Sequence, residues 1–90
     1  MNENPKKLFK IADIWLASAL SLALKVEPKL SLEDGRVIFS FPATDGLLEI
    51  MQGISSGKIK FDFISYSEKV KQLKHQLIVM KKGGKDASSM

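Results

Sequence analysis

The longest apolar stretch of the chain is FKIADIWLASALSLALKV, residues 9–26. Asp13 interrupts it, and the unbroken apolar and small segment after Asp13 covers residues 14–24, whereas a membrane-spanning helix needs about twenty residues. A secretion signal would end in an A-x-A-like cleavage site, and the charged sequence KVEP follows here instead. The pattern therefore predicts a buried helix over residues 7–26. Pro28 limits this helix, because the residue before a proline avoids helical dihedral angles.

Two alternating apolar and polar runs come next, in KLSLEDGRVIFSFP, residues 29–42. They flank Asp34-Gly35, a dipeptide that is typical of two-residue hairpin turns. Pro42 ends the second run because proline has no N–H for the sheet ladder. The sequence predicts a β-hairpin with its apolar residues on one face, and these residues are Leu30, Leu32, Val37, Phe39 and Phe41.

The segment TDGLLEIMQGISSG, residues 44–57, predicts a short helix. Thr44 is the expected N-cap, Asp45 lies in the first turn, where a negative charge suits the helix dipole, and Gly57 is a natural stop. The next segment, KIKFDF at residues 58–63, alternates again. It is either a short third strand or an extended connector.

The last predicted element is an amphipathic helix over residues 65–82, whose apolar positions follow a four-three spacing up to Gly83-Gly84, its expected end. These apolar positions are Tyr66, Val70, Leu73, Leu77 and Met80. The predicted organisation is a flexible N-terminus over residues 1–6, one domain over residues 7–82 and a disordered C-terminal tail over residues 83–90. The element order α-β-β-α-(β)-α predicts a small α+β domain, a β-hairpin sheet with three helices on one face.

Composition excludes several kinds of chemistry. The chain of 90 residues has no cysteine and one histidine, His75, so a disulfide, a thiolate metal site and a histidine pair are all impossible within one chain. Asp13 has no second carboxylate or base at a suitable spacing, so we expect it to act as a cap or a surface residue. We therefore expect no enzyme, no cofactor and no metal, and a cytoplasmic protein that does not enter a membrane.

Aromatic residues on strands beside lysines can form a platform on which nucleic-acid bases stack. The candidates here share a pleat face with their aliphatic neighbours, and a domain this small needs one sheet face for its core. We therefore expect the phenylalanines to be structural, and they are Phe39, Phe41, Phe61 and Phe63.

The net charge of +4 is concentrated at the chain ends, and residues 65–85 contain six lysines against the single acid Glu68. A basic face on the last helix is what phosphate binding requires, although such a face also serves solubility alone. Two further cations near the hairpin and the connector could supplement it. The predicted nucleic-acid-binding residues are Lys71, Lys74, His75, Lys81, Lys82, Lys60 and Arg36.

The sequence also resembles a family of short bacterial and phage proteins whose domain has no known function. The family opens on the pattern F-x-T-x-D-hydrophobic-x-x-A-x-x-L, which Phe9, Asp13, Ala17 and Leu20 match, while Ile11 stands at the usual threonine. The aromatic strand VIFSF, the short middle helix and the ending FDFISYSEKVKQLKHQL extend the resemblance to residues 9–80. It implies a small protein of bacteria, phages or mobile elements that binds nucleic acid or a larger protein, and no catalytic residue.

Two functions follow as expectations. The first is a non-enzymatic accessory protein that binds RNA or DNA through the phosphate backbone, for instance a nucleoprotein subunit of a phage or mobile element. The alternative is a protein-interaction module, a dimer, adaptor or inhibitor, because the helix predicted over residues 7–26 is apolar almost all round. Small residues at Ala17, Ser18 and Ser21 would let a partner approach that helix closely.

Overall fold

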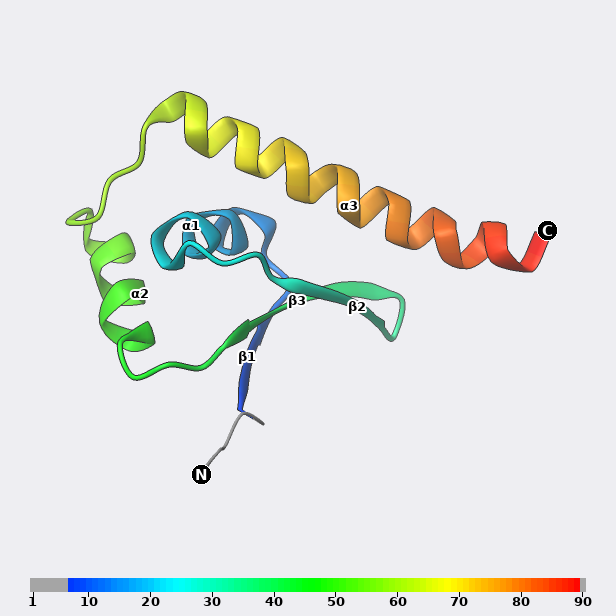
Figure 1. Ribbon diagram of the computed structural model, residues 1–90, viewed down its shortest axis with the longest axis horizontal. Helices are drawn as coiled ribbons and strands as arrows, with labels where there is room; N and C mark the ends of the chain where they lie inside the picture. The colour runs from blue at the N-terminus through cyan, green and yellow to red at the C-terminus, as the bar shows by residue number, and fades with distance from the viewer. Residues whose placement is uncertain (1–6, 90) are drawn as a thin grey trace.

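The structure is a computed structural model that describes residues 7–89, with side chains described from Lys7 to Lys82. It is a mixed α+β fold in which a three-stranded antiparallel sheet packs against three helices (Figure 1), as the sequence predicts. The strand order is β1-β3-β2, so β3 is central. In chain order the elements are β1 (Leu8–Ile11), α1 (Ile14–Leu24), β2 (Lys29–Glu33), β3 (Arg36–Pro42), α2 (Leu47–Ser56) and α3 (Phe63–Ser89).

The prediction of one helix over residues 7–26 is wrong at its start, because the first residues form the strand β1. This strand pairs with β3, and the pairs Phe9–Phe41 and Ile11–Phe39 bring apolar residues together on one face. Helix α1 begins only after Asp13, whose carboxylate accepts hydrogen bonds from the backbone N–H groups of the first turn. Alternation of apolar and polar residues over four positions is typical of a strand. Here the alternating residues of β1 directly precede the apolar run of α1, so the two segments resemble one helix in the sequence.

The hairpin forms as predicted, with Glu33 paired to Arg36 across the two-residue turn. Asp34 and Gly35 both adopt positive φ, 54° and 79°, which suits the right-handed twist of a hairpin. Residues 58–63 do not form the third strand, so the connector interpretation is correct for them up to Asp62. The third strand of the sheet is β1 instead.

Both ends of α2 lie near the predicted positions, but the N-cap is different. Gly46 is the N-cap and makes no side-chain cap bond, and Thr44 contributes only its carbonyl oxygen, which accepts from Leu47 N at 3.1 Å. The prediction of Thr44 as N-cap is therefore wrong. Gly57 ends the helix as predicted, with φ of 83° and its N–H bonded to the carbonyl of Ile54.

Helix α3 is longer than predicted at both ends. It begins at Phe63, and Asp62 caps it by accepting the N–H of Ser65 at 3.0 Å. It continues through Gly83 and Gly84, so this pair does not end it; glycine weakens a helix by about 1 kcal/mol without stopping it. The predicted flexible residues 1–6 lie outside the described residues. Met90 and the side chains of residues 83–89 also lie outside them. The disordered tail predicted over residues 83–90 therefore stays a prediction.

The core lies between the sheet and the helices. Phe39 and Phe41 of β3 are 0% exposed and pack with residues from all three helices, among them Leu20, Leu47 and Leu73. The prediction that the phenylalanines are structural is confirmed for these two. Phe61 is only partly buried, and Phe63 is 80% exposed, so the prediction is wrong for Phe63.

Candidate nucleic-acid interface on α3

Five of the seven predicted nucleic-acid-binding residues lie on α3 and are exposed. We call them the basic strip: Lys71, Lys74, His75, Lys81 and Lys82. The opposite side of the same helix carries Val70 and Leu73, which are buried against the rest of the fold. Helical periodicity thus separates a packed side from an exposed side, which carries these cations together with the exposed Ile64 and Ile78.

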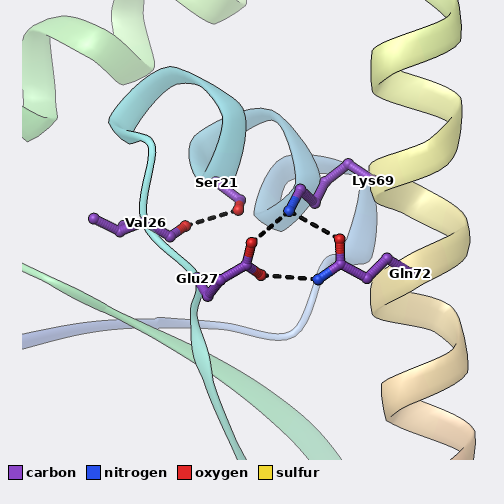
Figure 2. A network of polar contacts seen from close by, with 5 residues as sticks. All are labelled: Ser21, Val26, Glu27, Lys69 and Gln72. Carbon is purple, nitrogen blue, oxygen red and sulfur yellow. Dashed lines mark hydrogen bonds and ion pairs between the residues drawn. The ribbon is translucent and has the colours of Figure 1, made fainter.

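A polar network fixes α3 to the connection between α1 and β2 (Figure 2). Lys69 Nζ donates to Glu27 Oε2 at 2.6 Å and to Gln72 Oε1 at 3.0 Å, and Gln72 Nε2 donates to Glu27 Oε1 at 3.0 Å. Ser21 Oγ donates to the carbonyl of Val26 at 2.7 Å and holds the same connection. The network adds polar contacts to the packing of Val70 and Leu73, and this packing leaves the basic strip facing solvent.

Lys69 therefore differs from the other lysines of α3. Its side chain is only 12% exposed and its charge is paired with Glu27. The other ion pair among the described side chains, Lys10–Glu33, lies on the sheet. Between Phe63 and Lys82 the single acid is Glu68, so the outward side of α3 has a positive net charge.

Arg36 and Lys60 lie apart from the basic strip. Arg36 precedes the buried Val37 in β3, so its side chain belongs to the outer face of the sheet, away from the helices. Lys60 lies on the connector before α3, where it lines an open cleft. The structure thus places the predicted site in three regions, of which only the strip on α3 gathers several residues.

The cleft beside Lys60 has a volume of about 450 Å³ and was not predicted from the sequence. It lies where α1, α2, the connector and the start of α3 meet. Its walls are apolar and aromatic, and the lining residues are Ala19, Ile54, Ile59, Lys60, Phe61, Phe63 and Tyr66. The sequence does not indicate it, because Phe63 lies three residues before Tyr66 and so continues the apolar spacing that predicts packed positions.

Tyr66 organises one wall of this cleft. Its ring stacks on Phe61 and Trp15 with ring centroids 6.0 and 6.4 Å apart, and its hydroxyl donates to the carbonyl of Trp15 at 2.9 Å. Partial burial, and to a smaller extent the charge of Asp13, raise the pKa of Tyr66 above its ordinary value of 10.0. The hydroxyl therefore stays protonated at neutral pH and remains a donor.

The predicted partner interface on the first helix is enclosed by the chain itself. Ala17, Ser18 and Ser21 are all buried, and Ser18 Oγ donates to the carbonyl of Ile14 at 2.8 Å. Helix α3 runs across α1 (Figure 1), and small side chains let packed helices approach closely. The prediction that a partner contacts these three residues is therefore corrected: they lie inside the fold.

Within residues 7–82 no cluster of three or more His, Cys, Asp or Glu side chains is arranged to hold a metal ion. In the same part of the chain no helix combines the length and the apolar character needed to cross a bilayer. Comparison with protein-family models, curated proteins and solved structures finds no match to this chain. The resemblance to the short bacterial and phage proteins stays a prediction.

Proposed function

We propose that this chain is a small, non-enzymatic, cytoplasmic protein that binds the phosphate backbone of nucleic acid through the basic strip of α3. The observation that carries the proposal is the strip itself: four lysines and a histidine on the exposed side of a helix whose other side is packed. The resemblance to phage and bacterial proteins supports the further proposal of an accessory subunit in a nucleoprotein of a phage or mobile element.

The dimensions of the strip suit a charged polymer. Lys71 and Lys82 are eleven residues apart, which corresponds to about 16 Å along a helix axis. A duplex carries one phosphate charge per roughly 1.7 Å of its axis, so the strip can face several phosphates at once. Long, flexible lysine side chains neutralise phosphates and do not distinguish base edges, so we expect binding without sequence preference.

The proposal is tested by fluorescence anisotropy of a labelled oligonucleotide at a series of salt concentrations. We expect binding at low salt to duplex DNA, single-stranded DNA and RNA of the same sequence. The logarithm of the association constant should fall linearly with the logarithm of the salt concentration, by about 0.7 to 0.9 per phosphate contacted. No binding at low salt, or an affinity independent of salt, would contradict the proposal.

Two double variants locate the contact. Lys71→Gln/Lys74→Gln removes two charges from the strip, and Lys29→Gln/Arg36→Gln removes two charges from the outer face of the sheet. Because both remove the same net charge, only their positions differ. We expect the first variant to reduce the salt slope on duplex DNA by about 1.8, the contribution of two phosphate contacts, and the second to change it little. Equal effects would mean that net charge alone drives binding.

The alternative function, a protein-interaction module, needs a surface other than the buried residues of α1. A groove of about 390 Å³ between β2 and α3 offers exposed apolar surface, lined by Leu30, His75, Gln76, Val79 and Met80. Sedimentation of the purified protein tests self-association through such a surface. A dimer at low micromolar concentration would favour this alternative, and a monomer would disfavour its dimeric form.

A further inference from the structure

We propose that the cleft beside Lys60 receives a nucleobase of single-stranded nucleic acid whose phosphates lie on the basic strip. This inference rests on the proposed function and specifies its substrate, a single strand with accessible bases. In a duplex the bases are stacked on one another and paired, so their rings are not available to an aromatic side chain of the protein. The cleft thus adds a preference that the strip alone cannot provide.

The lining of the cleft suits a flat aromatic ring. Phe61, Phe63 and Tyr66 contribute aromatic rings, and Ile54 and Ile59 contribute apolar surface from α2 and the connector. The volume of about 450 Å³ falls in the usual range for small-molecule sites. Phe61 and Tyr66 stack on each other at 6.0 Å, so this wall is already ordered before a base arrives.

Phe63 is the residue most available for stacking. It is 80% exposed although it is a large apolar side chain, and it begins α3 at the rim of the cleft. A phenylalanine with a free ring face stacks on any base without sequence preference, which agrees with phosphate binding that is also independent of sequence.

The cleft lies in line with two lysines of the basic strip, Lys74 and Lys81. Phe63, Lys74 and Lys81 are separated by eleven and seven residues, so at 100° per residue they lie within about 20° of one line along the helix. Phe63 and Lys74 are about 16 Å apart along that line. A strand that follows this side of α3 can therefore place a base in the cleft and phosphates on the lysines.

The charges near the cleft permit a phosphate there. Lys60 lines the cleft and supplies a cation. The two nearby acids both cap helices: Asp62 accepts from the N–H of Ser65 at 3.0 Å, and Asp13 accepts from the N–H of Trp15 at 2.9 Å. A carboxylate at a helix N-terminus faces the positive end of the helix dipole, which offsets part of its charge.

An abasic probe separates stacking from phosphate binding. We would compare, by anisotropy at one low salt concentration, a labelled single-stranded oligothymidylate, an abasic oligonucleotide with the same number of phosphates, and a duplex of the same length. We expect the thymidylate to bind roughly 5- to 150-fold more tightly than the abasic probe, the range measured for one stacked base. Equal binding of the two would overturn this inference and leave the proposed function standing, whereas failure of all three probes to bind would overturn both.

Phe63→Ala tests the residue itself, with Ile64→Ala as the matched control. Ile64 is the next residue on α3 and is 63% exposed, but it does not line the cleft. We expect Phe63→Ala to weaken thymidylate binding by at least about fivefold and to leave abasic binding unchanged, and Phe63→Trp to retain the wild-type affinity. Equal effects of the two alanine variants, or an equal loss for both probes, would overturn the role of Phe63.

Discussion

At the scale of single residues, Asp13 separates the first strand from the first helix. Its Oδ1 accepts from the N–H groups of Trp15 at 2.9 Å and Leu16 at 3.4 Å, so α1 begins at Ile14. The sequence favours a capping or surface role for this residue, and the capping role is confirmed. The sequence does not reveal that the residues before Asp13 pair with β3, because such pairing depends on a partner about thirty residues away.

Tyr66 illustrates how one side chain joins two helices. It is an apolar position in the spacing of α3, and the sequence predicts this. Its hydroxyl bond to Trp15 and its stacking on Phe61 are tertiary contacts that no local pattern specifies. These contacts order the wall of the cleft, which is why the sequence did not indicate the cleft.

We predict that Tyr66 makes the protein less stable at high pH. Because the pKa of Tyr66 is raised in the folded state, the folded protein binds its proton more tightly than the unfolded chain does. The contribution of Tyr66 to the unfolding free energy is fully present below its ordinary pKa of 10.0 and is lost as the pH rises through its pKa in the folded state. Urea unfolding of the wild type and Tyr66→Phe across this range measures the effect.

Above pH 10 the unfolding free energy of the wild type should fall more than that of Tyr66→Phe. The lysines titrate in both proteins, so the difference between them reports Tyr66 alone. At neutral pH the variant should be less stable by about 1 kcal/mol, because it lacks the hydrogen bond to Trp15. Parallel pH profiles for the two proteins would contradict this account of Tyr66.

At the scale of elements, the position of α3 determines which of its lysines are available. The helical spacing predicts the packed side of α3 correctly, as Val70 and Leu73 are buried. It does not predict that Lys69 turns toward Glu27, because Glu27 lies 42 residues earlier in the chain. Among the described side chains of α3, Lys69 is therefore paired within the fold, whereas Lys71, Lys74, Lys81 and Lys82 stay exposed.

We predict that the contact between Lys69 and Glu27 stabilises the docking of α3 modestly. The Glu27 side chain is 59% exposed, so solvent screens the pair, and a coupling of about 0.5 kcal/mol is expected. A double-mutant cycle with Lys69→Gln and Glu27→Gln, measured by urea unfolding, gives this coupling. Lys71→Gln is the control and should leave stability almost unchanged, since Lys71 is exposed. A coupling of zero would mean that apolar packing alone fixes α3.

At the scale of the whole molecule, the fold class is predictable from the sequence, whereas the strand order is not. The hairpin around Asp34-Gly35 and the end of α2 at Gly57 follow from local turn chemistry, and both form as predicted. The third strand of the sheet is β1, and its place beside β3 depends on tertiary pairing between residues far apart in the sequence.

The enclosure of α1 is the other property of the whole molecule. A helix that is apolar almost all round must be covered, and α1 contacts α2, α3 and β1, with Ala17 and Ser18 0% exposed. The chain thereby covers these small residues of α1 without a partner. This removes the sequence-based reason for placing a partner interface on α1. The exposed side of α3 is left as the surface on which we place the function.

The proposed function places nucleic acid along the exposed side of α3. Amide chemical-shift mapping by ¹⁵N NMR, during titration with a single-stranded oligonucleotide at low salt, tests the position directly. We expect the shifts to concentrate from Phe63 to Lys82 on α3 and on the adjoining connector at Lys60, with little change on β2. Shifts concentrated on the outer face of the sheet, around Lys29 and Arg36, would contradict it.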